Sequence, residues 1–512
     1  MNKRFAATLL FTSLIALAGC EGDDGSPGAA GATGAAGPAG PAGPAGTNGS
    51  STSVDIVADT VTTDANDMRG LTFAQVGDNA NKIYVSGHVG ITDDTRQVVV
   101  GRFFADGSLD TSFGGDGFVE LEATATEGSS DENSYGVAEL LNGDVVAVVN
   151  ALDADGGRSV YMFRLAPDGT QVPGWGDADG KVEVVFGYAN ADNATFPGAP
   201  AALPSDLAWD VQTDRSVMTD RVVVFGQGSA SDGTRTDRDR YVARLDVTAT
   251  GATTDPTFNS GSAFTYNATG VLNDNNRRGL VEADGKIVSS GYTDLGGALD
   301  NHIFLIRLSA DGTLDADFGG FSDEPTITAT PGIAVFNPFK VDLGYAEAYA
   351  AGFQQSTQSY VVVGYGATTN DTTPSTLGYE TSLAQDVVLF RVSSGVSAGI
   401  DTGFGNVGTQ AVQSEGRGFP TNEDRGRHIV TLPDDRAVVA GRIGGNPAAF
   451  VFTVDGQLDD RVLGDGIVEL PNETVNSQFF GLAVSPEGNR VALTTNTNDN
   501  GARLVIMKLA LD

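Results

Sequence analysis

The residues of this 512-residue chain that are chemically suited to catalysis are few and widely separated. Cys20 is the only cysteine, so the remainder of the chain can form neither a disulfide nor a thiolate metal site. His88, His302 and His428 are more than a hundred residues apart, and their spacing does not indicate a Ser-His-Asp site. The sequence also lacks a Walker loop, a G-x-S-x-G elbow and an H-E-x-x-H motif. No catalytic residue is therefore predicted.

Two acidic turns bring carboxylates close together, as a calcium site requires. They are DADGG, with Asp153 and Asp155, and DADGK, with Asp177 and Asp179. Neither turn has the full spacing of a calcium loop, and Asp-Gly turns are abundant in the chain. These four residues are the candidates for a metal site, and ordinary turns are the alternative. No other cofactor is expected.

The charge of the chain excludes one class of partner. Lys and Arg number 30 against 66 Asp and Glu, which gives a formal net charge of −36. Nucleic-acid binding depends on basic residues that neutralise phosphates, so a nucleic-acid partner is not expected. Such acidity also disfavours docking to anionic lipid through a basic patch.

The N-terminus has the pattern of a secretory signal over residues 1–19. Lys3 and Arg4 precede an apolar run, and small residues precede Cys20. Leu17-Ala18-Gly19-Cys20 resembles the bacterial lipobox, which implies cleavage before Cys20 and attachment of a lipid to its sulfur. The alternative is an ordinary signal peptide that ends near a cysteine. We expect a protein held by this lipid in the bacterial cell envelope, at the outer membrane and exposed on the cell surface.

A triplet repeat follows within residues 20–50. Glycine occupies every third position from Gly22 to Gly49, which is the requirement of a collagen triple helix. The segment resembles bacterial collagen-like stalks, and at about 3.1 Å per residue it would span roughly 85 Å. It is expected to act as a spacer, and it could form a homotrimer. The alternative is an extended linker that does not trimerise.

Residues 51–512 contain short β-rich runs that recur. FFADGSLDTSFGGDGFVEL at 103–121 has relatives at 163–184, 306–327, 390–412 and 452–470, and a looser copy at 243–266. A run such as KIYVSG from Lys82 precedes each copy, and upstream of it lies a third run with a small residue near its middle. Examples of this third run are RGLTFAQ at 69, YGVAELL at 135, RGLVEAD at 278 and FGLAVSP at 480. A fourth run follows each turn, with SVDIVA from Ser53 assigned to the first copy.

Seven units of four strands predict an all-β fold, a seven-bladed β-propeller. A solenoid or a pair of stacked sandwiches is the alternative. The pattern G-x-V-V-x-G, then Φ-x-R-Φ, then D-G-x-L-D-x-x-F-G-x-x-G resembles the delta-sixty repeat family of bacterial surface and secreted proteins. The resemblance covers about residues 54–512 and implies a fold without a settled activity.

Charged and aromatic residues recur at fixed places in the repeats. We expect the arginines to form ion pairs within each blade and the aromatic residues to pack between blades. The alternative for the charged residues is a ring that binds an anion or a sugar. The arginines are Arg102, Arg164, Arg244, Arg307 and Arg391, and the aspartates of the following turn are Asp110, Asp255, Asp315, Asp401 and Asp459. The aromatic residues are Phe113, Trp175, Phe258, Phe318 and Phe404.

Functional residues are sought in segments that do not repeat, because insertions in such arrays often line a binding face. Three insertions stand out, at 187–206, 321–344 and 367–385. The layout of anchor, spacer and repeat platform predicts a protein that binds a protein or glycan ligand or acts in adhesion. The alternatives are a metal-dependent propeller hydrolase or lactonase and a periplasmic assembly scaffold.

Overall fold

The structure is a computed structural model, and the residues that it describes belong to one compact unit, Ser50–Asp512. The described residues are 57–60, 66–90, 96–123, 132–152, 157–186, 206–229, 238–268, 273–295, 301–338, 345–367, 385–396, 399–405, 409–412, 424–470, 477–497 and 501–511. The predicted signal peptide, lipid site and stalk, at residues 1–50, lie outside them. Asp153, Asp155 and most of the insertions at 187–206 and 367–385 also lie outside them.

The described residues form thirty strands and one short 3-10 helix, η1 (Gly77–Asn79). None of their helices is long and apolar enough to cross a membrane. Three sheets have four strands each. They are β6 (Asn133–Glu139), β7 (Val145–Leu152), β8 (Arg158–Leu165) and β9 (Lys181–Glu183); β20 (Tyr345–Gln354), β21 (Ser359–Ala367), β22 (Asp386–Ser393) and β23 (Thr409–Val412); and β24 (Arg425–Thr431), β25 (Ala437–Ile443), β26 (Asn446–Phe452) and β27 (Ile467–Glu469).

Two further sheets have five strands. One contains β10 (Leu207–Thr213), β11 (Arg221–Ser229), β12 (Arg238–Val247), β13 (Ala252–Thr254) and β14 (Phe264–Tyr266). The other contains β15 (Asp274–Val281), β16 (Ile287–Asp294), β17 (Asn301–Leu308), β18 (Phe321–Ser322) and β19 (Ile333–Phe336). The segment at 321–344 was expected to be an insertion, and that expectation is wrong in part. Ile333 pairs with Ile306, so β19 is an outer strand of this sheet.

The last sheet joins the two ends of the described chain. It contains β2 (Asn66–Phe73), β3 (Ile83–Val89), β4 (Gln97–Phe103) and β5 (Phe118–Leu121), followed by β28 (Gln478–Val484), β29 (Arg490–Thr497), β30 (Arg503–Lys508) and β1 (Val57–Thr60). β1 pairs antiparallel with β30, with Val57 opposite Ile506. The run assigned to the first repeat therefore belongs beside the last one. This pairing covers the outer edge of β30, which would otherwise present free backbone groups.

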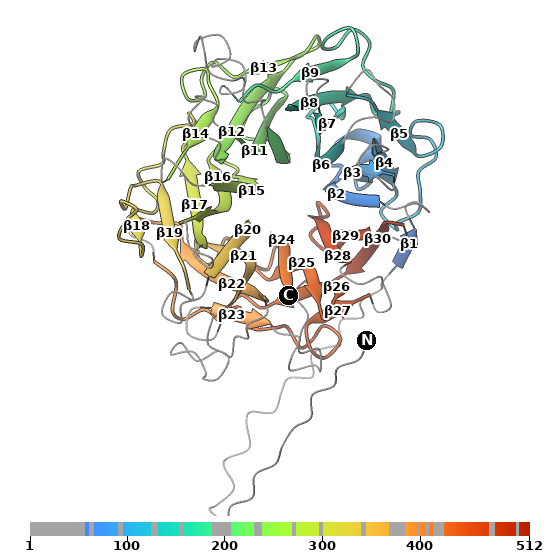
Figure 1. The fold of residues 1–512 in the computed structure, drawn as a ribbon. Coiled ribbons are helices and arrows are strands. Elements are labelled where there is room, and N and C mark those ends of the chain that lie inside the picture. The colour runs from blue at the N-terminus through green and yellow to red at the C-terminus, as the bar shows by residue number, and fades with distance from the viewer. Residues whose placement is uncertain are drawn as a thin grey trace, which may run out of the picture. The chain divides into compact units, whose positions relative to one another are not determined.

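The sheets are arranged around a common centre as a β-propeller (Figure 1). Paired strands run antiparallel except β18 and β19, and the strands β2, β6, β10, β15, β20, β24 and β28 lie against one another at the centre (Figure 1). We call these seven the inner strands. Apolar side chains fill the space between neighbouring sheets, and several clusters of the core draw on two sheets each.

The recurring aromatic residues lie inside these clusters. Phe113 packs with Val145 and Phe163 of the next sheet, and Phe318 packs with Tyr360 of the next sheet. Phe113, Trp175, Phe258 and Phe318 are 0 % exposed and Phe404 is 1 % exposed. Burial of a whole aromatic side chain contributes about 1.5–3 kcal/mol, so these residues are a major part of the contact between sheets.

The recurring arginines connect neighbouring sheets as well as neighbouring strands. Arg307 donates from Nε to Asp315 of its own sheet at 2.8 Å and from Nη1 to the Ser394 carbonyl of the next sheet at 2.9 Å. Arg244 and Arg391 repeat this arrangement, with the Asp255 and Asp401 carboxylates and the Ala310 and Val454 carbonyls. Arg102 pairs in the same way with Asp110 and the Pro167 carbonyl. We call this arrangement the arginine staple.

Two repeats that lack one partner keep the staple by substitution. The second copy has Val172 at the aspartate position, and there Arg164 turns to Asp144 at 2.7 Å while its Nη1 donates to the Thr248 carbonyl. The sixth copy has Thr453 at the arginine position, and there Arg436 reaches Asp459 at 3.0 Å and the Ala510 carbonyl. The fold therefore conserves the contact rather than the residue position.

Hydrogen bonds keep four of the staple carboxylates ionised. Burial alone would raise the pKa of Asp255, but the Thr257 hydroxyl and amide and the nearby guanidinium groups hold it below its usual value. The pKa of Asp110, Asp401 and Asp459 is lowered in the same way. These carboxylates stabilise the fold above the pKa of the unfolded chain, and that contribution is lost as the pH falls toward their folded values.

Removal of one staple arginine tests this arrangement. Arg307→Leu would leave the Asp315 carboxylate, whose side chain is 6 % exposed, with the Asp317 amide at 3.0 Å and a single cation, Lys286, at 3.7 Å. An unpaired buried charge costs about 3–5 kcal/mol, so we expect a decrease in unfolding free energy of about 3 kcal/mol. Arg391→Leu is the matched control. Its partner Asp401 is 38 % exposed, so water can solvate the carboxylate and the loss of unfolding free energy should be smaller. Thermal unfolding of both variants checks the order, and an equal loss would contradict it.

Candidate functional site in the central channel

Every inner strand is interrupted by a β-bulge near its middle, where its register with the second strand of the sheet shifts. A bulge leaves a residue outside the ladder and redirects its side chain. The bulged positions include one arginine or aromatic residue from each inner strand. These residues are Arg69, Tyr135, Trp209, Arg277, Tyr349, Arg427 and Phe480.

These seven side chains contact one another in a closed circle, which we call the aromatic–arginine ring. The Arg69 guanidinium carbon lies 4.3 Å from the Tyr135 ring centre and 4.1 Å from that of Phe480. Tyr135 stacks on Trp209 at 5.1 Å. Arg277 lies 4.4 Å from Trp209 and 5.1 Å from Tyr349. Arg427 closes the circle, at 4.5 Å from Tyr349 and 5.2 Å from Phe480.

Cation–π attraction is stronger where water is excluded, at about 2 kcal/mol or more per contact. Arg277, Tyr349, Arg427 and Phe480 are each less than 8 % exposed, so much of the ring is in such an environment. The edges of the guanidinium groups have polar partners as well. Arg69 donates to Asp67 at 2.7 Å, Arg277 to the Tyr292 hydroxyl at 2.7 Å and Arg427 to the Gln478 amide oxygen at 2.8 Å.

Small residues after the bulge allow the inner strands to approach one another. A Cβ on Gly70 would lie 3.0 Å from the backbone of Gly136 in the next inner strand. One on Gly279 would lie 1.9 Å from the Phe225 ring, and one on Gly481 would lie 2.2 Å from the Thr494 hydroxyl. The small residues of RGL, YGV and FGL are therefore needed at the centre of the propeller, and the residue before the glycine joins or borders the ring.

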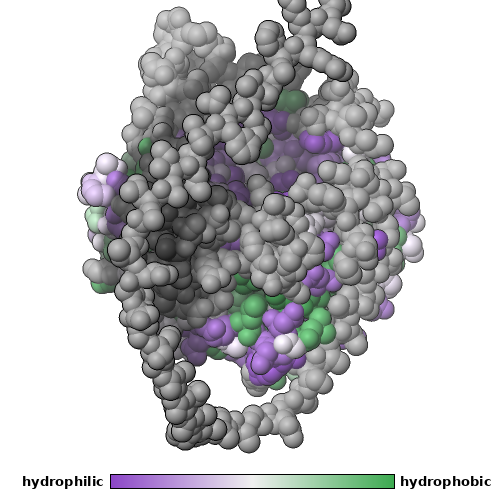
Figure 2. Space-filling view, turned by 60° about the horizontal axis from the view of Figure 1, so that its bottom comes forward, coloured by the Kyte–Doolittle hydropathy of each residue, from purple (hydrophilic) through white to green (hydrophobic). Residues whose placement is uncertain are grey.

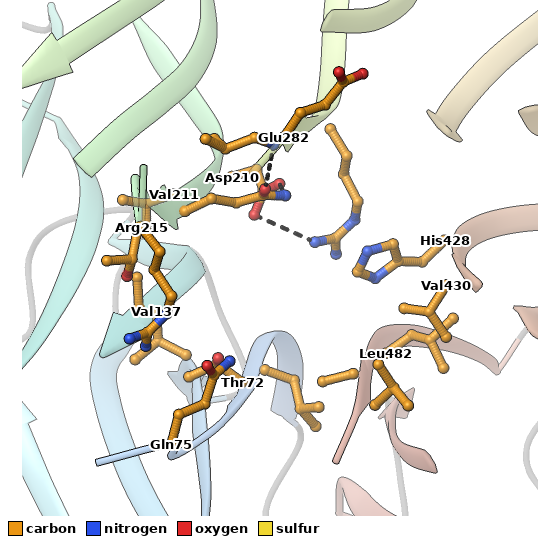
Figure 3. A pocket seen from close by; sticks show the side chains of 18 of the residues that line it. Thr72, Gln75, Val137, Asp210, Val211, Arg215, Glu282, His428, Val430 and Leu482 are labelled. Carbon is orange, nitrogen blue, oxygen red and sulfur yellow. Dashed lines mark hydrogen bonds and ion pairs between the residues drawn. The ribbon is translucent and has the colours of Figure 1, made fainter. Parts of the chain in front are cut away.

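A cavity of about 320 Å³ lies in the channel on the side of the ring where the inner strands end. Its walls include Thr72, Gln212 and Thr213 as well as aliphatic residues, which six of the seven inner strands contribute beyond their bulges. The aliphatic residues include Leu71, Val137, Val211, Val281, Val430 and Leu482. Figure 3 shows Val137, Val211, Val430 and Leu482 surrounding an open space, with Gln75, Arg215 and Glu282 also on its lining.

The floor of the cavity is polar and borders the ring. Arg278, Asp210 and His428 line it, and each directly follows a ring residue in sequence. Arg278 crosses the channel and donates from Nη2 to the carbonyls of Arg69 at 3.0 Å and Phe480 at 3.1 Å. Its Nη1 lies 3.8 Å from the Asp210 carboxylate, which is too far for a hydrogen bond.

Burial sets the protonation of the floor residues. It raises the pKa of Asp210 above its usual value, although the Arg278 guanidinium and the Gln212 amide act in the opposite direction. It lowers the pKa of His428 well below its usual value, with a further lowering by Arg278, so this imidazole is neutral at pH 7. The floor thus combines a buried cation with a neutral imidazole.

The structure does not bring the three histidines together. His88 lies in β3, His302 in β17 and His428 in β24, so they belong to three sheets, and of the three only His428 lines the cavity. Asp177 accepts hydrogen bonds from the amides of Asp179 and Lys181, and Asp179 pairs with the Lys181 ammonium group at 3.1 Å. Within the described ranges, no group of three or more His, Cys, Asp or Glu side chains is placed to hold a metal ion. The recurring arginines and aromatic residues lie between sheets, away from the cavity lining.

Two buried carboxyl groups lie where inner strands begin. Asp206 directly precedes β10 and is 3 % exposed, and its Oδ1 has no hydrogen-bond partner among the described atoms. Burial, with a smaller contribution from the Glu183 carboxylate, raises the pKa of Asp206 to about 7. Burial also raises the pKa of Asp274, the first residue of β15, to about 6, although the Thr293 hydroxyl lowers it.

Arg427→Lys tests the ring. The ammonium group of lysine cannot stack on Tyr349 and Phe480 as a planar guanidinium does, so we expect the unfolding free energy to fall by about 2 kcal/mol. Arg425→Lys is the matched control. Its Nε also bonds one amide, that of Gln385, but its guanidinium carbon lies 4.9 Å from the Tyr365 ring, outside the circle. Thermal or urea unfolding that gives equal losses would contradict the special role of Arg427.

Asp206→Asn tests the buried carboxyl. Between about pH 4 and pH 7 this group is ionised in the unfolded chain and protonated in the folded protein, so the unfolded state binds fewer protons and stability falls as the pH rises. The substitution removes this decline, and its gain in melting temperature is expected to be larger at pH 8 than at pH 5. Asp116→Asn, at an exposed position, is the control. A gain that is the same at both pH values would contradict the assignment.

Comparison with solved structures finds propeller-like chains of low similarity. A chain of the mitotic checkpoint complex is 11 % identical, with a TM-score of 0.42, and the match covers 89 % of this chain and 91 % of that one. A luciferin-regenerating enzyme is 9 % identical, with a TM-score of 0.35 and coverage of 89 % and 96 %. A gluconolactonase from Xanthomonas campestris is 12 % identical, with a TM-score of 0.27 and coverage of 89 % and 90 %. These values support no inference about activity.

No curated protein matches the chain. A family model does match it, over residues 81–113 and 282–318, which lie in the first and fourth repeats. Each matched segment runs from the second strand of a sheet to the buried aromatic residue of the turn, Phe113 or Phe318. The chain is therefore similar, in two of its repeats, to the family described as "Domain of unknown function (DUF5122) beta-propeller".

Proposed function

We propose that the protein is lipid-anchored through Cys20 in the bacterial envelope and presents a seven-bladed propeller of delta-sixty-type repeats for binding or adhesion. The Gly-X-Y segment would hold the propeller away from the membrane that carries the lipid. That membrane is the outer membrane, and the propeller is exposed on the cell surface. This proposal rests on the order of anchor, spacer and repeat domain in the sequence.

The observation that carries the binding role is the cavity in the channel. The aromatic–arginine ring lies at the centre of the propeller and borders the floor of the cavity. A concave site that combines aliphatic side chains with polar groups is typical of a ligand pocket. The ring also supports the count of seven blades, because each of seven inner strands supplies one member.

A metal-dependent hydrolase would need carboxylates that converge in the channel. Among the described residues, the carboxylates near the channel centre lie beside arginines, as Asp67 does at Arg69 and Asp210 at Arg278, and they do not converge as a metal site, which supports binding rather than that alternative. A periplasmic scaffold would share the same propeller, and only its location would differ.

Treatment of intact cells with bacterial collagenase tests the proposed location. The enzyme cleaves Gly-Pro triplets, which occur at 37–46, so a surface-exposed propeller should be released as an intact fragment. A variant without residues 22–49 is the control and should stay on the cells. Protection of the parent until the outer membrane is opened would contradict surface display and would favour the periplasmic scaffold.

A further inference from the structure

We propose that the channel cavity binds a small amphiphilic carboxylate, with its anionic head at Arg278 and its apolar body against the aliphatic wall. The inference names a ligand class for the binding function proposed above and rests on it. It does not depend on where the protein is displayed, so the two can fail separately.

The wall of the cavity suits an apolar body. Its lining between floor and rim consists mostly of Val, Leu and Ala side chains from the inner strands. Its volume of about 320 Å³ lies at the lower end of the range for small-molecule sites. An alkyl chain of moderate length would replace water along this wall and gain about 0.8 kcal/mol for each buried methylene group.

The charges at the centre of the channel favour an anion at the floor. Four arginines belong to the ring or to the floor: Arg69, Arg277, Arg278 and Arg427. The described residues place fewer carboxylates near them: Asp67 bonds Arg69, Glu347 interacts electrostatically with Arg277, and Asp210 lies 3.8 Å from Arg278. Arg427 is contacted by the neutral Gln478 amide and by aromatic rings. An added carboxylate would compensate this excess of buried positive charge.

The imidazole of His428 supplies a second contact for the head. Its Nδ1 is buried and has no hydrogen-bond partner among the described atoms. Figure 3 shows the ring pointing into the pocket. A neutral imidazole with its proton on Nδ1 can donate to one carboxylate oxygen while Arg278 Nη1 donates to the other.

The charged groups of the rim already have partners, which directs the anionic head to the floor. Arg215 pairs with Glu139 at 3.2 Å, and Glu282 accepts a hydrogen bond from the Tyr360 hydroxyl. On the face shown in Figure 2, the described residues that are visible include both hydrophilic and hydrophobic side chains.

Calorimetric titration with sodium octanoate tests the proposal. The protein is the full chain with Cys20→Ser, so that no attached lipid competes for the cavity. We expect one octanoate per chain and binding of 1-octanol at least tenfold weaker. Arg278→Gln, which removes the cation, and Val430→Trp, which fills the cavity, should each weaken octanoate binding about tenfold or more. Arg238→Gln removes a charge from an exposed position and should leave the affinity unchanged.

Two results would overturn the proposal: no binding of octanoate by the folded parent, or equal binding by the parent and both cavity variants. Equal affinity for octanol would overturn the role of the anionic head. Melting temperatures are measured for every variant, because Arg278 also bonds two backbone carbonyls, and Val430→Trp carries the test if Arg278→Gln does not fold. Release of the propeller by collagenase without octanoate binding would reject the ligand and leave the proposed display intact.

Discussion

The contact of seven side chains at the centre of the propeller is the constraint on which the rest of the structure depends. Sheets that meet around an axis leave a channel, and side chains from every inner strand must either fill it or line it. Here bulges turn one arginine or aromatic side chain per inner strand toward its neighbours, and each stacks on the next. Planar guanidinium groups can stack on the aromatic rings here, and cation–π attraction stabilises their buried charge.

The outer part of each blade is held by a different device. The arginine staple bonds a carboxylate of its own sheet and a carbonyl of the next sheet, so every staple opposes the separation of two neighbours. At the ends of the chain, β1 completes the sheet that contains β30. The ring therefore joins the inner strands, and the staples join neighbouring sheets. The pairing of β1 with β30 joins the two ends of the chain. In a chain with a net charge of −36, the guanidinium groups concentrate positive charge where water is excluded.

The periodic features of the fold follow from the sequence, because they depend on local pattern. Short β-branched runs, turn glycines and the repeated Phe113 and Arg102 positions indicate four-stranded units; three sheets have this form and two have a fifth strand. The ring could not be derived in this way, since Arg69 and Phe480 meet only after the two ends of the chain close. The sequence signal that pointed to the ring was the arginine or aromatic residue that precedes the glycine in RGL, YGV and FGL. Arg164 pairs with Asp144 because its own turn lacks an aspartate at the repeated position, and this pairing depends on tertiary contacts. The pairing of residues 333–336 as a strand depends on them too.

Amide hydrogen exchange, compared between the parent and Arg427→Lys, tests most directly whether the ring holds the inner strands as one unit. The account predicts that protection falls not only in β24 but also in β20 and β28, whose ring residues touch Arg427, and in β2 and β15 beyond them. It also predicts that outer strands such as β9 stay unchanged. Loss of protection confined to β24, or no loss in any inner strand, would contradict the central role of the ring.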